Sequence, residues 1–162
     1  MGTKRRLPVL AALFALGSTL VMVAPSHAAT TTQKESPSSA TSQRRAWIPK
    51  LQPFFPDDHE DVIIKVDTAT RNNLLHTCPT AFVCLTVGRG DGYHDYYRLY
   101  NCTQRSLMNF IGEDALTNAQ IGNASVVLKD RWGGTLRIIP ADPDNSTPVR
   151  VDWDEVWYID PC

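Results

Sequence analysis

Residues 82–100 read FVCLTVGRGDGYHDYYRLY, two runs rich in β-branched and aromatic residues on either side of a glycine-rich turn. This pattern is typical of a β-hairpin, because glycine readily adopts the positive φ that tight turns require. Glycine- or proline-containing turns also separate most of the later strand-like runs, so the sequence predicts an all-β sandwich. Those later runs are residues 124–128, 135–139, 149–153 and 156–159, and only residues 106–111 suggest a helical turn.

The hairpin has a similar second copy later in the chain. Residues 85–100 align with residues 126–139, and an acidic segment follows each copy, at residues 113–118 and 152–157. A repeated unit of about forty residues that cannot close a core alone implies that two units pack together. Two Greek-key motifs fit the length of residues 78–162.

The first 77 residues contain no cysteine and divide into three parts. Residues 1–28 combine three basic residues, an apolar run and a Ser-His-Ala ending, the pattern of a secretory signal peptide. Residues 29–46 are rich in Thr, Ser and Gln and are predicted to be a disordered linker. Residues 47–77 contain a strand-like run and leave two interpretations open: a strand packed on the following domain, or a propeptide removed near Arg44-Arg45.

Charge and motifs exclude several classes of function. The chain has 16 basic and 17 acidic residues, and Lys4, Arg5 and Arg6 lie in the signal, so the mature chain has a net charge of −4. This charge argues against nucleic-acid binding, and no segment after the signal is apolar enough to span a membrane. The sequence contains no His-Glu-x-x-His or Gly-x-Ser-x-Gly motif. We therefore expect a secreted, extracellular, monomeric protein that is not an enzyme and requires no cofactor.

All four cysteines lie in the last part of the chain, at Cys78, Cys84, Cys102 and Cys162. An even number of cysteines in a small exported domain predicts disulfide bonds rather than zinc ligands. Four cysteines allow three pairings, and their order in the chain does not choose among them.

The cysteine-containing part opens with CPTAFVCL at residues 78–85 and continues through the glycine-tipped hairpin to Tyr-Asn-Cys at residues 100–102. With the acidic segment and the second Gly-Gly hairpin after them, these elements resemble the βγ-crystallin-like domains, and in particular the secreted bacterial metalloproteinase (peptidase) inhibitors. The resemblance implies a disulfide-bonded βγ-crystallin-like double Greek-key sandwich over residues 78–162. It also implies a function as a proteinase inhibitor of metalloendopeptidases.

The same resemblance implies a disulfide pairing and a metal site. The family's opening loop implies a bond between Cys78 and Cys84, which leaves Cys102 to pair with Cys162. The family's acidic element can bind calcium, and here Asp114 and Thr117, with the adjacent Glu113, match its ligand positions. The alternative interpretation is that Asp114 and Thr117 cap a turn through side-chain to backbone hydrogen bonds.

An inhibitor would present a rigid, disulfide-braced loop to the cleft of an extracellular protease, because preorganisation limits the entropy lost on binding. We expect contacts from residues 88–93 or 140–148, but no position matches the family's reactive bond, so the inhibitory loop is unknown. The alternative function is that of a calcium-binding or structural extracellular module. If a turn at Asp154-Glu155 intervenes, one of Trp153 and Trp157 is buried and the other is exposed, and an exposed tryptophan would be a binding anchor. Core packing of both is the preferred interpretation.

Overall fold

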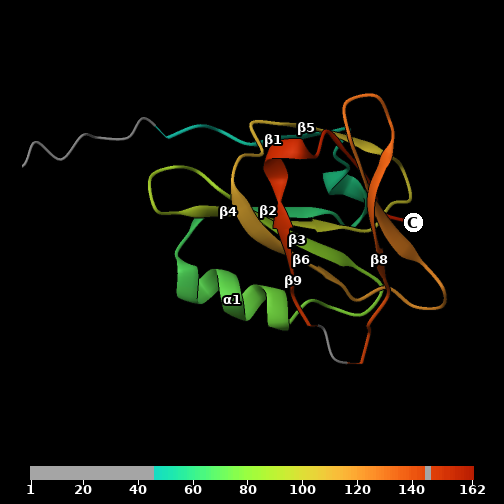
Figure 1. The fold of residues 1–162 in the computed structure, drawn as a ribbon. Coiled ribbons are helices and arrows are strands. Elements are labelled where there is room, and N and C mark those ends of the chain that lie inside the picture. Colours follow the sequence, from blue (N-terminus) through green and yellow to red (C-terminus); the bar gives the residue numbers. More distant parts are fainter. Residues whose placement is uncertain (1–45, 145–146) are drawn as a thin grey trace, which may run out of the picture. The chain divides into compact units, whose positions relative to one another are not determined.

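The computed structural model describes residues 46–144 and 147–162, and within them ten strands form two antiparallel five-stranded sheets (Figure 1). The all-β expectation is therefore confirmed. The predicted signal peptide, residues 1–28, and all of the predicted linker except Ala46 lie outside the described residues. Among the described residues, no helix is long and apolar enough to cross a membrane.

Each sheet combines strands from distant parts of the sequence. Sheet A has the order β1 (Lys50–Gln52), β5 (Arg105–Met108), β10 (Tyr158–Asp160), β7 (Ser125–Lys129) and β8 (Thr135–Pro140). Sheet B has the order β2 (Asp61–Val66), β4 (His94–Leu99), β3 (Val83–Gly88), β6 (Glu113–Asn118) and β9 (Val149–Asp152). One helix, α1 (Thr68–His76), and two short 3-10 helices, η1 (Pro56–Asp58) and η2 (Trp153–Glu155), complete the described elements.

The predicted internal repeat is visible in the strand order. The β3–β4 hairpin lies beside β6 in sheet B, and the β7–β8 hairpin lies beside β10 in sheet A. The remaining strand of each half crosses to the opposite sheet, where β5 pairs with β10 and β9 pairs with β6. Each half therefore completes the sheet of the other, and neither half closes a core alone.

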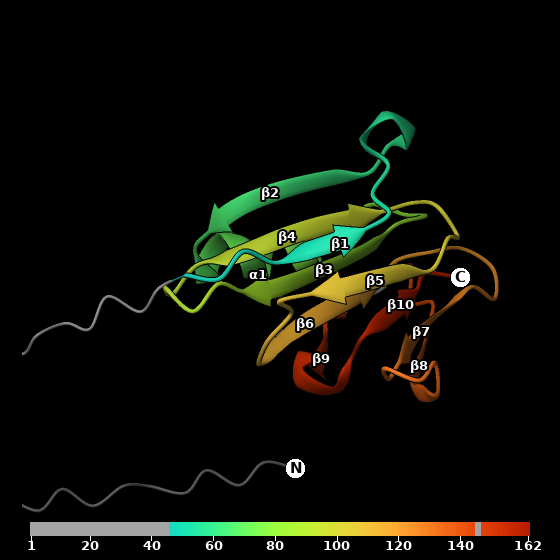
Figure 2. The same cartoon turned by 90° about the horizontal axis from the view of Figure 1, so that it is seen from above.

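Residues 47–77 pack on the domain rather than standing apart from it. Their strand β1 pairs with β5, and their strand β2 pairs with β4, so this segment supplies an edge strand to each sheet (Figure 2). The packing agrees with the first interpretation of this segment, whereas the cleavage position of the second, Arg44-Arg45, lies outside the described residues. The folded region accordingly extends N-terminally beyond the expected domain boundary at Cys78.

The single described α-helix was not expected from the sequence. Helix α1 begins after Asp67, whose carboxylate accepts a hydrogen bond from the Thr70 N–H at 2.7 Å, and it buries Leu75 against sheet B. The helical turn expected at residues 106–111 is absent there. Residues 105–108 instead form β5, because both β1 and β10 pair with this segment and Leu107 is buried.

Two apolar clusters hold the layers together. The larger lies between the sheets, and Trp153 is fully buried in it, with its indole N–H donating to the Thr86 carbonyl at 2.9 Å. The smaller lies between α1 and sheet B and contains Leu75, Tyr96 and Cys84. Strand alternation explains the division, because neighbouring residues such as Tyr96 and Tyr97 point to opposite faces of the sheet.

The disulfide bonds are Cys78–Cys84 and Cys102–Cys162, the pairing that the family resemblance implied. The first has a sequence separation of 6 residues and joins Cys78 to Cys84, which lies within β3. The second spans 60 residues and ties the chain terminus to the connection between β4 and β5.

We predict that the two bonds contribute unequally to stability. Replacing Cys102 and Cys162 by Ser should lower the free energy of unfolding by about 4 kcal/mol, against about 2 kcal/mol for Cys78 and Cys84, because a longer loop constrains the unfolded chain more. Urea denaturation of the two double variants measures both values. Equal losses, or a larger loss for the shorter loop, would contradict the prediction.

A buried ion pair joins the N-terminal segment to the rest of the domain. Glu60 is 3% exposed, and its Oε1 accepts from Arg105 Nη2 at 2.6 Å and from the backbone N–H groups of Tyr100 and Asn101 at 3.2 Å. Its other oxygen, Oε2, accepts from the Phe55 N–H at 2.9 Å. One carboxylate therefore fixes the residues before β2, the connection after β4 and the start of β5.

We predict a large loss of stability for Glu60→Ala. The change leaves the buried Arg105 guanidinium without its carboxylate, which costs about 3–5 kcal/mol, and denaturant unfolding measures the loss. The matched control is Glu113→Ala, which removes an exposed ion pair with Arg150 and should cost no more than about 1 kcal/mol. Similar losses for the two variants would contradict the prediction.

Candidate functional site

The three residues expected to bind calcium do not converge on one point. Glu113 is exposed and pairs with Arg150. Thr117 is buried in β6, and its hydroxyl has no hydrogen-bond partner among the described residues. Calcium requires six to eight oxygen ligands around one centre. Within the described part of the chain, no group of three or more His, Cys, Asp or Glu side chains is placed to hold a metal ion.

Asp114, the central residue of the expected site, is engaged by donors instead. Its Oδ1 accepts from the Thr86 hydroxyl at 2.6 Å and lies 3.0 Å from Arg71 Nη1, and its Oδ2 lies 2.7 Å from His94 Nδ1. Since a neighbouring guanidinium opposes a cation at this carboxylate, the geometry does not favour calcium there. The turn-capping interpretation is wrong, because Asp114 and Thr117 lie inside strand β6.

The same network connects a hydroxyl, an imidazole and a carboxylate in space. His94 Nε2 lies 3.3 Å from Thr68 Oγ1, while its Nδ1 faces Asp114. This order of groups is that of a hydrolytic triad, which also needs free amides to stabilise an oxyanion. Here the Thr70 N–H of the first helical turn donates to the Asp67 carboxylate, and this hydrogen bond lowers the pKa of Asp67. The network joins α1 to sheet B through the Thr68, His94 and Asp114 side chains.

The first expected contact loop, residues 88–93, is partly covered. The Trp47 indole N–H donates to the Gly88 carbonyl at 2.8 Å, and the Trp47 backbone N–H donates to the Arg89 carbonyl at 3.0 Å. A Cβ atom added at Gly90 would lie 2.1 Å from the Trp47 ring, so the ring lies directly on the turn. In the second expected loop, residues 140–148, residues 145 and 146 lie outside the described residues.

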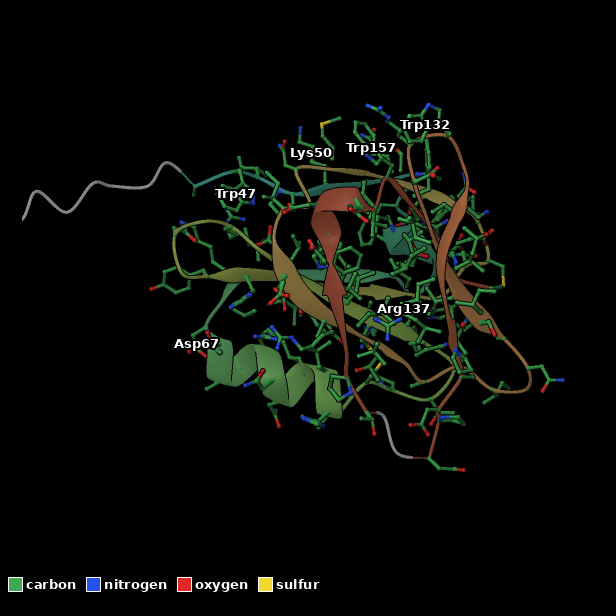
Figure 3. All side chains as sticks on the ribbon, in the orientation of Figure 1. Trp47, Lys50, Asp67, Trp132, Arg137 and Trp157 are labelled. Carbon is green, nitrogen blue, oxygen red and sulfur yellow. A yellow bond between two sulfur atoms is a disulfide. The ribbon has the colours of Figure 1, made fainter. Side chains whose placement is uncertain are left out.

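The equivalent hairpin of the second repeat carries an exposed tryptophan. Trp132, between β7 and β8, is 77% exposed, and Trp157, just before β10, is 50% exposed. Figure 3 shows both side chains on the same side of the domain, and both line one groove. The expectation of core packing holds for Trp153 and is wrong for Trp157, because η2 intervenes and changes the direction of the chain.

Two adjoining grooves meet at Trp157. One, of about 560 Å³, lies along β5 and the residues that follow it, and the other, of about 470 Å³, lies beside the β7–β8 hairpin. Because Asp154 and Trp157 line both grooves, the two form a continuous surface, which we call the Trp132–Trp157 surface. Its main side chains are Met108, Ile111, Trp132, Leu136, Asp154 and Trp157.

Hydrogen bonds fix the backbone beneath both indoles. Asp130 Oδ1 accepts from the N–H groups of Trp132 and Gly134 at 2.8 Å, and the Arg131 guanidinium lies 4.0 Å from the Trp132 ring centroid. The Trp157 N–H donates to the Lys129 carbonyl, and the Trp157 carbonyl accepts from the Leu107 N–H, both at 2.9 Å. The backbone that carries both tryptophans is therefore held in place by hydrogen bonds within the domain.

The charges along this surface are mainly negative. Asp130, Asp154 and Glu155 line the second groove together with Arg131. The surface thus offers exposed aromatic and aliphatic side chains beside carboxylates, which suits a partner with apolar and basic groups.

Comparison with protein-family models, with curated proteins and with solved structures gave no match.

Proposed function

We propose that this protein is a secreted inhibitor of extracellular endopeptidases, and of metalloendopeptidases in particular, with a βγ-crystallin-like double Greek-key fold. The exposed Trp132–Trp157 pair, on a backbone held in place by hydrogen bonds, carries the proposal. The choice of protease class rests on the resemblance of residues 78–102 to the bacterial inhibitors. The fold assignment is supported by the strand order, in which each half lends one strand to the opposite sheet.

The energetics of protein recognition favour such a surface as a docking site. Tryptophan is enriched among the few interface residues that supply most of the binding energy. When a partner covers a large apolar side chain that a rigid turn holds in water, the free energy of the complex falls. Since the backbone beneath Trp132 and Trp157 is already hydrogen-bonded, little backbone conformational entropy is lost on binding.

The asymmetry between the two repeats points to the same surface. In the first repeat, Trp47 from the N-terminal segment lies on the glycine turn at residues 88–92. In the second repeat, the neighbouring Arg131 guanidinium lies over the Trp132 ring, and Trp132 is still 77% exposed. The β7–β8 hairpin is therefore the tip that can enter a protease cleft, in place of the loops expected from the sequence.

The alternative, a calcium-binding or structural extracellular module, has less support. Asp114, the principal calcium ligand expected in such a module, already contacts Arg71, His94 and Thr86. Isothermal titration calorimetry with calcium separates the two functions, because affinity tighter than about 0.1 mM would favour this module.

We predict that the purified protein inhibits a thermolysin-type protease and that Trp132→Ala and Trp157→Ala each raise the inhibition constant by about 30-fold or more, the loss typical of a central interface residue. The matched control is Tyr93→Ala, because Tyr93 is a similarly exposed aromatic residue on the equivalent hairpin, 47% exposed. Its inhibition constant should stay near that of the unchanged protein.

A subtilisin-type protease serves as the second target and tests the class assignment. Inhibition of that enzyme alone would overturn the metalloendopeptidase assignment but keep the inhibitor function. Inhibition of neither enzyme at micromolar concentration would remove the proposed function. Loss of inhibition in Tyr93→Ala but not in the tryptophan variants would show that the β3–β4 hairpin, rather than the β7–β8 hairpin, contacts the protease.

A further inference from the structure

Strand β2 is a free edge of sheet B with an apolar centre. It pairs with β4 on one side, and no described strand lies on its other side (Figure 2). Its three central residues are exposed, Val62 at 37%, Ile63 at 40% and Ile64 at 62%. An exposed apolar edge strand is a template for pairing with another strand.

The backbone groups of β2 show which residues face the free edge. The Val62 N–H donates to Asp61 Oδ1 at 2.8 Å, whereas the Lys65 N–H donates to Asp95 Oδ1, on β4, at 3.0 Å. Backbone groups of successive residues alternate in direction along a strand. The N–H and carbonyl groups of Val62 and Ile64 therefore point away from β4.

The side chains of β2 are complementary to a second copy of the same strand. Asp61 and Lys65 lie at equal distances in sequence on either side of Ile63. In an antiparallel pair centred on Ile63, Asp61 of each copy faces Lys65 of the other, and Val62 faces Ile64. Opposite charges directly across a pair of strands stabilise it. Val62 and Ile64 are also the residues whose backbone groups point away from β4, so the same register forms hydrogen bonds there, and the Val62 N–H exchanges its contact with Asp61 Oδ1 for one with the second strand.

We propose that the protein forms a two-fold symmetric dimer through antiparallel pairing of β2, which joins two copies of sheet B into one continuous sheet. The partner is a second copy of this chain, because the edge is self-complementary in both charge and apolar side chains. The proposal replaces the monomer expected from the sequence.

The same charges limit the pairing to one register. A shift by two residues would place an apolar side chain opposite Asp61 or Lys65, and charged residues at strand edges oppose such pairing. The bulge between Ile63 and Val66, where Lys65 has a φ of 58°, places Lys65 at the end of the regular pairing, so the paired segment is short. The dimer is accordingly expected to dissociate on dilution.

Charge reversal tests the register directly. Analytical ultracentrifugation of the purified protein over a range of concentrations should show a mass that rises toward twice that of the monomer. Lys65→Asp and Asp61→Lys each place like charges opposite one another at both ends of the pair, and each should raise the dimer dissociation constant about tenfold or more. The double variant, Asp61→Lys with Lys65→Asp, restores opposite charges and should restore the dimer.

Two controls separate this effect from misfolding and from net charge. Lys50→Asp makes the same change of net charge on β1, an edge strand of the other sheet, and should leave the dimer unchanged. Circular dichroism confirms the fold of each variant, and Asp tolerates the positive φ at position 65.

Three outcomes would overturn the proposal: a monomer at all concentrations up to about 1 mM, the weak-binding range, equal effects of Lys65→Asp and Lys50→Asp, or a double variant as weak as the single ones. The test is independent of protease inhibition, because none of the residues of β2 lines the Trp132–Trp157 surface. Inhibition by Lys65→Asp should therefore match that of the unchanged protein.

Discussion

The buried ion pair between Glu60 and Arg105 is the contact on which the arrangement of both sheets depends. The side chains of both residues are fully buried, and the Arg105 guanidinium also lies 4.7 Å from the centroid of the Phe55 ring. Removing two charges from water is costly, and additional hydrogen bonds offset part of that cost. Here backbone groups of Phe55, Tyr100 and Asn101 complete the set around Glu60.

This pair lies where the chain leaves one sheet for the other. Strand β4 ends at Leu99 in sheet B, and β5 begins at Arg105 in sheet A, so the connection carries the chain between layers. The Cys102–Cys162 bond fixes the same connection to the chain terminus. Because β5 pairs with β10, the ion pair and the disulfide together position the Leu107–Trp157 backbone contact, and thereby one side of the Trp132–Trp157 surface.

Local patterns predicted the hairpins correctly, and distance in the sequence explains most of what they missed. Strand alternation and glycine turns reveal β3–β4 and β7–β8 because both strands of each hairpin lie close together in the chain. The Glu60–Arg105 pair joins residues 45 positions apart, which no local pattern records. Helix α1 was missed because its sequence, TATRNNLLH, is mostly polar and buries only Leu75.

The candidate site shows why tryptophans are difficult to assign from sequence. Trp153 and Trp157 share a short segment, yet Trp153 is fully buried and Trp157 is half exposed, because η2 changes the direction of the chain between them. Trp132 could have been found, since it lies in a turn between Asp130 and Gly133, where side chains are rarely buried. Glu113 and Asp114 are adjacent in the sequence, but strand β6 directs them to different partners, Arg150 and Arg71, which adjacency alone does not reveal.

The two proposed contacts use different parts of the fold, and this separation has a consequence for binding. The Trp132–Trp157 surface is formed by sheet A and its connections, whereas β2 is an edge of sheet B. Pairing through β2 therefore covers none of the residues that line the grooves. A dimer of this kind presents two tryptophan surfaces, and two sites on one particle bind an immobilised or oligomeric protease with higher avidity than either site alone. The short edge that limits the strength of the dimer would then regulate avidity through protein concentration.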